Sequence, residues 1–371
     1  MQTRLGIEAL SSIDGRVGLL THPAAVLPDL RHSLDALVER GAQLSAVFGA
    51  EHGFRGTAQA GDSEAATIDV ATGLPVYDTY AHSVEELSTM LTASGTEVLL
   101  VDLQHVGARF YTYESTLYDA IAAAAIAGVR VIVTDRPNPI GGEVVDGPVL
   151  RTPYASFVGR APIAMRHGLT MGELGLLFAD LLNAPAPDVV PMEGWSRGDR
   201  FEHTGLPWVP PSPNIPTAST AHVYAGTCLF EGTNLSIGRG TTTPFEVIGA
   251  PWLDGRLAGH LRSLDLPGTG FREIEFTPAF NDHAGVHLRG VAVHITDPDT
   301  FDPVRTALSM LTSIEHLYPG VMAFRPTIDK LAGTDALRLA IEAGAHPEDI
   351  VASWRDDLTA FADLRSGYLL Y

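Results

Sequence analysis

Cysteine and long apolar runs are nearly absent from this sequence. Cys228 is the only cysteine, which excludes an intramolecular disulfide and a metal site built from several thiolates. No stretch reaches the roughly 18 uninterrupted apolar residues of a membrane span, and the start MQTRLGIEAL lacks the parts of a signal peptide. As given, the chain is expected to be cytoplasmic; trimming of an exported protein at its N-terminus would leave the same appearance.

Positive charge is also scarce. The 371 residues include 24 lysines and arginines against 44 aspartates and glutamates, which gives a net charge of −20. This charge repels nucleic acid and anionic membranes, and no basic run offsets it. We therefore expect no nucleic-acid or membrane partner, and the sequence carries no indication of oligomeric state.

Several motifs of common enzyme classes are missing. The first strand is followed by THPAAVLPD where a dinucleotide site would have G-x-G-x-x-G, and GTNLSIGRGT lacks the GK[ST] ending of a P-loop. There is neither an H-E-x-x-H nor a G-x-S-x-G segment. The sequence thus predicts no cofactor, no metal and no Ser-His-Asp centre.

The first half of the chain repeats one pattern. Apolar runs that end in polar residues occupy 16–22, 43–52, 97–104 and 129–139, with helical spacing between them. A helix at 170–184, with Thr170 and Glu173 at capping-box spacing, and a strand at DVVPM follow. Continuous apolar strands that alternate with helices predict a parallel sheet covered on both faces, an α/β Rossmann-like domain over residues 1–200.

The residue pattern of the sequence changes near residue 200. The segment GLPWVPPSPNIPTAS is too rich in proline for regular structure and indicates a crossover between domains. Alternating strands at 271–280 and 286–297 and helical stretches at 302–319, 333–344 and 346–371 follow it. Residues 201–371 are therefore predicted to form a smaller α+β domain.

Polar residues follow the predicted strands of the first domain. Open parallel sheets bind ligands beyond the carboxyl ends of their strands, so these residues predict a site, although each alone is also an ordinary cap or turn former. They are Thr21, His22, Glu51, His52, Asp102, Gln104, His105, Asp135, Arg136 and Asn138.

Two segments have side chains suited to particular ligands. In GAEHGFRGTAQAGD, Glu51 and His52 fit a turn, a metal pair or a catalytic centre, and the missing ligand spacing weakens the metal interpretation. In DLQHVGARFYTYES, Tyr111 and Tyr113 share a face if the segment is extended, and with Arg109 they suit a sugar ring as well as they suit a buried core.

Read together, six motifs resemble the exo-β-N-acetylmuramidase family, earlier known as a domain of unknown function. They are GAEHGFRGTAQAGD, VDLQHVGARFYTYEST, DRPNPIGGEVVDGPVL, MRHGLTMGELG, PPSPNIPT and GTCLFEGTNLSIGRGTTTPFEVIGAPW. The resemblance implies a glycoside hydrolase that removes terminal non-reducing N-acetylmuramic acid from peptidoglycan fragments. It also implies an active-site cleft of the Rossmann-like domain closed by the C-terminal domain. Many relatives are exported, so the missing signal peptide is a departure.

Glycoside hydrolysis usually requires two carboxyl groups. Glu51 is the expected general acid, since burial beside Phe54 and the sheet would favour its protonated form. Glu231 is the expected partner, ahead of Asp102, Glu143 and Glu114; attack by the substrate's own acetamido group remains an alternative. Arg55, Arg109, Arg136 and Arg239 are candidates to bind the lactyl carboxylate.

The remaining expected substrate-binding residues come from the same motifs: His52, Asp102, Gln104, Tyr111, Tyr113, Asp135, Asn138, His167, Asn214 and Asn234. Two other functions fit the same residues. One is hydrolysis of a different amino sugar, and the other is non-catalytic binding of a sugar. A carboxylic acid at a desolvated strand end favours an enzyme, because a lectin gains nothing from it.

Overall fold

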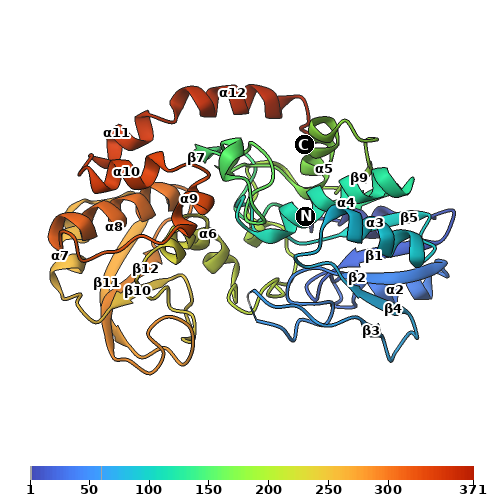
Figure 1. The fold of residues 1–371 in the computed structure, drawn as a ribbon, viewed down its shortest axis with the longest axis horizontal. Helices are drawn as coiled ribbons and strands as arrows, with labels where there is room; N and C mark the ends of the chain where they lie inside the picture. Colours follow the sequence, from blue (N-terminus) through green and yellow to red (C-terminus); the bar gives the residue numbers. More distant parts are fainter. Residues whose placement is uncertain (1, 60) are drawn as a thin grey trace. The chain divides into compact units, whose positions relative to one another are not determined.

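The computed structural model describes residues 2–59 and 61–371, and the chain divides into two compact units (Figure 1). Unit 1 contains Met1–Val144, Gly168–Pro216 and Asp363–Tyr371, and unit 2 contains Val145–His167 and Thr217–Ala362. The chain thus enters unit 2 twice and ends in unit 1. The domain boundary expected between residues 200 and 201 stays a prediction.

Unit 1 is built on a seven-stranded sheet in the order β3-β4-β2-β1-β5-β6-β9. Every neighbouring pair is parallel except β3 and β4 at one edge. The strands are β1 (Val17–Thr21), β2 (Leu44–Gly49), β3 (Thr67–Ile68), β4 (Pro75–Asp78), β5 (Val98–Asp102), β6 (Arg130–Thr134) and β9 (Asp188–Val190). The predicted α/β class is confirmed, while β3 and β4 are strands that the sequence pattern did not reveal.

The order of strands reverses at β1. The strands β2 and β4 extend the sheet on one side of it, and β5, β6 and β9 extend it on the other. The register places Thr21 beside Gly49 of β2 and beside Asp102 of β5, so the carboxyl ends of these three strands are level. In open α/β sheets such a reversal is where ligands bind.

Helices cover both faces of this sheet. Alternate residues of a strand point to opposite faces: Val17 and Leu19 are buried in one cluster with Leu34 of α2, whereas Leu20 lies with Leu87 of α3 on the other side. On that second side α4 packs against both α3 and α5. The helices are α1 (Gly6–Ala9), α2 (Ser33–Glu39), α3 (Val84–Ala93), α4 (Thr112–Ala127) and α5 (Met171–Leu182).

Unit 2 has two small antiparallel sheets and a set of helices. The sheets are β10-β12-β11 and β7-β8, with α8 packed against α6, α7, α10 and α11. This arrangement confirms the predicted α+β class. The elements are β7 (Asp146–Val149), β8 (Ala164–Arg166), β10 (Val247–Ala250), β11 (Thr269–Phe276), β12 (Leu288–Ile295), α6 (Ala218–Thr227), α7 (Arg256–Ser263), α8 (Pro303–Leu317), α9 (Thr327–Ala332), α10 (Ala336–Glu342) and α11 (Pro347–Ala352).

The last stretch of the chain is not one helix. The pattern over 346–371 predicted a continuous helix, but α11 ends at Ala352 and a separate α12 (Arg355–Ser366) follows. Short 3₁₀ helices lie at Thr152–Tyr154, Phe201–His203 and Cys228–Gly232. In the part of the chain that the structure describes, no helix has the length and apolar character needed to cross a membrane.

Candidate functional site

The side chains that follow β1, β2 and β5 form the candidate site of unit 1. Glu51 follows β2 by two residues, and its 8% exposed side chain is held on both oxygens. The backbone N–H of Gly61 donates to Oε1 at 2.7 Å, and the hydroxyl of Thr112, the first residue of α4, donates to Oε2. Glu51 is therefore a buried carboxyl group with a fixed orientation.

Hydrogen bonds of its own backbone and of the Glu64 side chain hold the loop after Glu51 together. His52 has a positive φ of 74°, its N–H donates to the carbonyl of Asp62 at 3.2 Å, and its Nδ1 donates to the carbonyl of Ala58 at 3.2 Å. Glu64 accepts hydrogen bonds from the N–H groups of Arg55 and Thr57. These contacts hold the loop in one conformation and so fix the position of Glu51.

Arg55 is anchored at the edge of the same loop. Its Nη2 lies 2.6 Å from Oδ1 of Asp69, and its guanidinium lies 4.2 Å from the centre of the Phe54 ring. The Arg55 side chain stays 45% exposed. Among the four expected lactyl-binding arginines it is thus one with a solvent-accessible cation.

Two tyrosines close to Glu51 stay protonated at neutral pH. Burial, together with the charges of Glu51, Asp62 and Asp78, raises the pKa of Tyr80 to about 12. Burial also raises the pKa of Tyr113, whose hydroxyl donates to the carbonyl of Pro211 at 2.9 Å. Both tyrosines can therefore act only as neutral hydrogen-bonding groups.

Tyr111 and Tyr113 do not lie in an extended segment, because α4 begins at Thr112. Their rings nevertheless touch edge to face with centroids 4.8 Å apart, and the ring of His22 meets Tyr113 at 4.7 Å. Tyr111 is 5% exposed and Tyr113 is fully buried. The two rings thus pack against each other in the interior of unit 1.

His22 is a neutral imidazole at the end of β1. Burial, reinforced by the charge of Arg136, lowers its pKa well below the usual value. Its Nε2 accepts the backbone N–H of Gln104 at 2.8 Å, so the ring proton is on Nδ1. The side-chain amide of Gln104 in turn donates to the carbonyls of His105 and Pro137, each at 2.9 Å. These bonds fix the segments that leave β1 and β5 relative to each other.

Asp102 and Arg136, both expected to bind substrate, bind each other. They are almost fully buried, with Nε of Arg136 2.6 Å from Oδ1 of Asp102. Burial alone would raise the pKa of Asp102, but the guanidinium lowers it below the usual value. Asp102 is therefore a carboxylate at neutral pH and not a proton donor.

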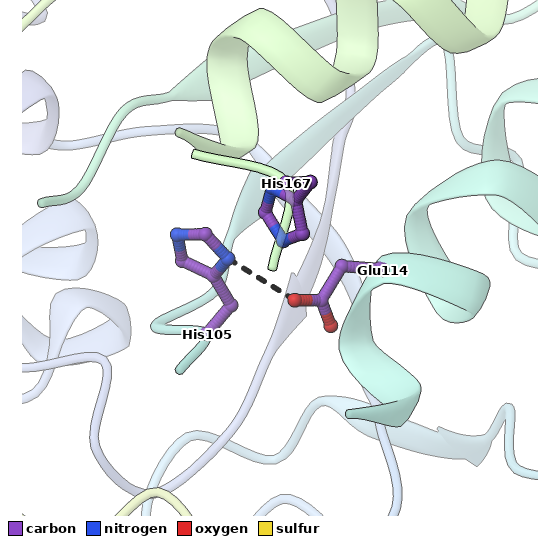
Figure 2. Close-up of side chains that lie close together, drawn as sticks. All are labelled: His105, Glu114 and His167. Carbon is purple, nitrogen blue, oxygen red and sulfur yellow. Dashed lines mark hydrogen bonds and ion pairs between the residues drawn. The ribbon is translucent and has the colours of Figure 1, made fainter. Parts of the chain in front are cut away.

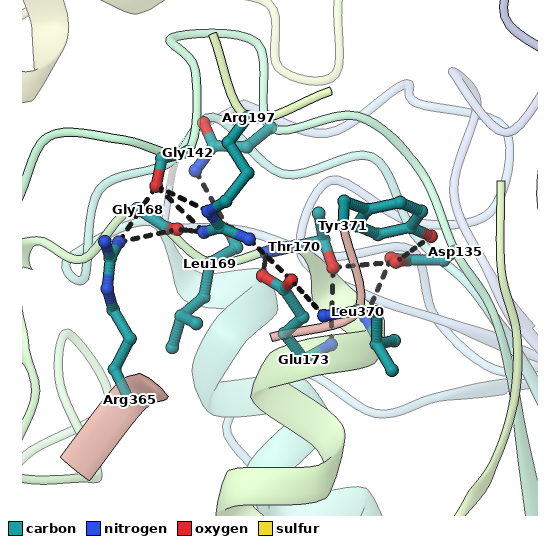
Figure 3. A network of polar contacts seen from close by, with 12 residues as sticks. Asp135, Gly142, Gly168, Leu169, Thr170, Glu173, Arg197, Arg365, Leu370 and Tyr371 are labelled. Atoms are coloured by element: carbon teal, nitrogen blue, oxygen red, sulfur yellow. Dashed lines mark hydrogen bonds and ion pairs between the residues drawn. The ribbon is translucent and has the colours of Figure 1, made fainter. Parts of the chain in front are cut away.

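Asp135 and Asn138 hold the start of α5. Oδ1 of Asp135 accepts the N–H of Gly172 at 2.8 Å, and its Oδ2 accepts the hydroxyls of Thr170 at 2.7 Å and Tyr371 at 2.8 Å. The amide of Asn138 donates to the carbonyl of Leu169 at 2.9 Å. Figure 3 shows Asp135 with Thr170 and Tyr371. Asp135 and Asn138 thus hold the N-terminal end of α5 in place.

The predicted capping box of α5 is confirmed. Thr170 is the N-cap, with its hydroxyl and backbone joined to Glu173 in both directions. Glu173 also binds Nη1 of Arg197 at 2.6 Å and the N–H of Leu370 at 2.9 Å (Figure 3). Glu173 therefore has the structural role expected of it.

His105 and Glu114 form a buried pair, drawn in Figure 2 together with His167. Nδ1 of His105 lies 3.2 Å from Oε1 of Glu114. Burial lowers the pKa of His105 to about 3 and raises that of Glu114 well above its usual value. A carboxylic acid thus meets a neutral imidazole here. Both groups are of kinds that bind metal ions, but a metal would require Glu114 in its ionised form.

The buried arginine and the two asparagines differ in their surroundings. Arg109 is 1% exposed, and burial lowers its pKa to about 9. Asn214 is 4% exposed in unit 1. In unit 2, the amide of Asn234 donates to the carbonyl of Val321 at 3.1 Å and accepts the N–H of Ala323 at 3.0 Å. Asn234 thus closes a loop of its own unit.

The other expected residues lie in unit 2. Glu231 sits in the 3₁₀ helix after α6 and forms an ion pair with Arg239. His167 directly follows β8 and is fully buried. Cys228 is free and buried, and burial raises the pKa of its thiol, so it is a core residue and not a reactive thiolate.

Three groups around Glu51 were not predicted from the sequence: Thr112, the N–H of Gly61 and Tyr80. Thr112 stands between two tyrosines just before the helical spacing begins, where a hydroxyl indicates a cap more readily than a partner for a distant acid. Tyr80 follows β4, a strand that was itself not predicted. Only the fold brings these groups to Glu51.

Two family models together match most of the chain. The model described as exo-β-N-acetylmuramidase NamZ, N-terminal, matches residues 17–219, and the corresponding C-terminal model matches residues 222–371. The chain is 46% identical over 361 residues to the peptidoglycan β-N-acetylmuramidase NamZ of Bacillus subtilis (strain 168), which covers 96% of this chain and 87% of that protein.

Two crystal structures of DUF1343 family proteins from Bacteroides fragilis NCTC 9343 have the same fold. One is 34% identical with a TM-score of 0.91, and the other is 30% identical with a TM-score of 0.81. Each comparison covers 100% of this chain and 99% of the other.

Proposed function

This chain belongs to the exo-β-N-acetylmuramidase family and is a glycoside hydrolase, and from that premise we propose that it releases terminal non-reducing N-acetylmuramic acid from fragments such as the disaccharide MurNAc–GlcNAc. Peptidoglycan-derived disaccharides or muropeptides are the proposed substrates. The observation that carries the proposal is the position of Glu51, buried at the reversal of strand order with both of its oxygens held.

Glu51 is the proposed general acid. Its proton passes to the glycosidic oxygen as the bond from that oxygen to the anomeric carbon breaks, and the bonding electron pair leaves with the oxygen. Asp102 is unsuited to this role, because its contact with Arg136 keeps it ionised. A held, buried carboxyl supports the role of Glu51, since proton transfer requires a donor of fixed direction.

Glu231 is the proposed second carboxylate. Its ion pair with Arg239 orients it, and the 28% exposure of its side chain leaves room for a ligand. In this role it acts on the anomeric carbon, as a base that activates water or as a nucleophile.

The lactyl carboxylate distinguishes N-acetylmuramic acid from N-acetylglucosamine, and we propose Arg55 as its first binding partner. The guanidinium of Arg55 is the one that combines solvent exposure with a fixed position on the loop of Glu51. Arg136 and Arg239 are engaged with Asp102 and Glu231, so they would bind substrate with their remaining N–H groups.

Release of N-acetylmuramic acid from MurNAc–GlcNAc tests the proposal. We expect turnover by the wild-type protein and a decrease of about 10²- to 10⁴-fold in kcat for Glu51→Gln, which keeps the shape but cannot donate the proton. Glu85→Gln, on the exposed face of α3, is the matched control and should leave the rate unchanged.

Three outcomes would count against parts of this proposal. Equal slow release by wild type and Glu51→Gln would remove the catalytic role and leave a sugar-binding protein. Comparable turnover of GlcNAc–GlcNAc would contradict the requirement for the lactyl group. Turnover of only another amino sugar would keep the hydrolase but change its substrate.

A further inference from the structure

The two oxygens of Glu51 have partners of different kinds. Oε1 accepts the backbone N–H of Gly61 at 2.7 Å, and Oε2 contacts the hydroxyl of Thr112. A backbone N–H can only donate a hydrogen bond, whereas a hydroxyl can donate one or accept one. Oε1 must therefore be an acceptor in both protonation states, while Oε2 can be an acceptor or a donor.

We propose that Thr112 is a positioning residue for Glu51 and that the acid proton resides on Oε2. This inference rests on the proposed function of Glu51 as general acid. When Glu51 is protonated, Oε2–H donates to the oxygen of Thr112 until a glycosidic oxygen replaces that partner. After the proton has left, the hydroxyl rotates and donates to the new carboxylate.

The local structure leaves the Thr112 hydroxyl free for this role. Thr112 is the first helical residue of α4, and the N-cap before it, Tyr111, makes no side-chain capping bond. The ring of Tyr113, the next residue, is buried against His22, which fixes the first turn of the helix. Thr112 itself is half-buried and faces the carboxyl of Glu51.

The other partner is held by a glycine conformation. Gly61 has a φ of +85°, a region that residues with a side chain rarely adopt. The next N–H along the chain, that of Asp62, donates to the carbonyl of Gln59 at 3.0 Å and closes the turn. The backbone therefore directs the Gly61 N–H at Oε1, and this N–H can only donate a hydrogen bond to it.

The Oε2–H bond of Glu51 breaks as the proton bonds to the glycosidic oxygen, and the bond from this oxygen to the anomeric carbon breaks with its electron pair on the oxygen. Glu51 is left as a carboxylate with one donor on each oxygen, Gly61 and Thr112. Hydrogen bonds to a charged acceptor are stronger than those to a neutral one, so the Thr112 hydroxyl favours the state after transfer.

Several titratable groups from other elements of unit 1 lie around Glu51. Tyr80 after β4 and Tyr113 of α4 stay neutral, because burial raises the pKa of both. Asp62 and Asp78 lie near Tyr80 as well and add negative charge around it.

Replacement of the hydroxyl by a methyl group tests the inference. We expect Thr112→Val to lower kcat on MurNAc–GlcNAc by about 10- to 100-fold with little change in KM, the effect of one charge-assisted hydrogen bond. The alkaline limb of its kcat/KM profile should move to higher pH, because the ionised acid has lost a donor. Thr112→Ser should restore both the rate and the profile.

An activated substrate separates proton donation from general damage to the site. A 4-nitrophenyl glycoside of N-acetylmuramic acid needs little protonation of its leaving group, so Thr112→Val should slow it by less than about 3-fold. The matched control is Thr116→Val, one turn further along α4, which should leave both rates unchanged. Circular dichroism and thermal unfolding verify that the variants fold.

The outcomes separate this inference from the proposed function. If Glu51→Gln is inactive and Thr112→Val has the wild-type rate and pH profile, Glu51 remains the acid and the role of Thr112 is refuted. Equal losses on both substrates would also refute it, since they indicate a structural role. If the wild-type protein releases no N-acetylmuramic acid, it is the proposed function that fails.

Discussion

Arg136 binds the carboxylate of Asp102 through two hydrogen bonds, with Nε 2.6 Å from Oδ1 and Nη2 2.9 Å from Oδ2. Asp102 ends β5 and Arg136 follows β6 by two residues, so the pair joins two neighbouring strands at the carboxyl edge of the sheet. Nη1 of Arg136 adds a bond of 3.1 Å to the carbonyl of Val26. The pair thus has a structural role in the candidate site, because it holds neighbouring segments together.

Asp102→Asn should therefore destabilise the protein. The variant leaves the buried guanidinium of Arg136 without a counter-charge, which costs about 3–5 kcal/mol. Because the pKa of Asp102 is lowered in the folded state, its contribution is complete above the unfolded value of about 3.9 and is lost as the pH falls through the folded value. Urea unfolding at pH 7 measures the loss.

The exposed pair of Arg4 and Glu193 gives a control for the Asp102 experiment. Its side chains are 49% and 62% exposed, so Glu193→Gln should change the free energy of unfolding by less than about 0.5 kcal/mol. A comparable loss in both variants would mean that burial does not determine the contribution of such pairs here.

Asp135 predicts a pH dependence of the opposite sign. Burial raises its pKa to about 6, against the hydrogen bonds from Thr170, Gly172 and Tyr371. A raised folded pKa means that the contribution of the acid to stability is complete below about pH 4 and is lost as the pH rises through 6. The free energy of unfolding of the wild type relative to Asp135→Asn should fall by about 2 kcal/mol between pH 4 and pH 7.

Urea unfolding of both proteins at pH 4, 5, 6 and 7 measures this difference, in which the other titrating groups largely cancel. A difference that rises with pH would show that the donors around Asp135 outweigh its burial and lower its pKa.

The tail after α12 supplies the third prediction. The hydroxyl of Tyr371 donates to Asp135 (Figure 3) and accepts the N–H of Met192 at 2.8 Å. Tyr371→Phe should therefore lower the free energy of unfolding by about 1–2 kcal/mol, since two buried groups lose a partner. Tyr368→Phe removes only a surface bond to Asp180 and should cost less than about 0.5 kcal/mol. Equal costs in chemical denaturation would contradict the role given to the tail.

Much of unit 1 could be predicted because its local signals agree with its fold. The strands β1, β2, β5 and β6 are apolar runs that the sheet buries on both faces, and Thr170 with Glu173 forms the cap that their spacing indicates. The strands β3 and β4 could not be predicted from the sequence, because they are short and their residues are partly exposed or polar. Short strands of this kind carry no periodic apolar signal.

The strand-end position of Glu51 could be predicted, but the contacts within the candidate site could not. Glu51 lies at a strand end, as the polar residues there indicated. The pairing of Asp102 with Arg136 was not foreseen, because two residues that each suit a ligand also suit each other once burial removes water from both. Thr112 was missed for a different reason: its hydroxyl reaches an acid 61 positions earlier in the chain, and no local pattern encodes that distance.

The identity of the second carboxylate is the last prediction. Glu231→Gln keeps the size of the side chain but removes its charge, so kcat for release of N-acetylmuramic acid should fall by about 10²- to 10⁴-fold while Arg239 stays in place. Glu143, a competing candidate in the segment that follows β6, has an exposed side chain. Glu143→Gln should therefore change kcat by less than about 2-fold. A large loss in Glu143→Gln with a near-normal Glu231→Gln would transfer the role to Glu143. If neither variant loses activity while Glu51→Gln does, a single protein acid acts with the substrate's acetamido group as nucleophile.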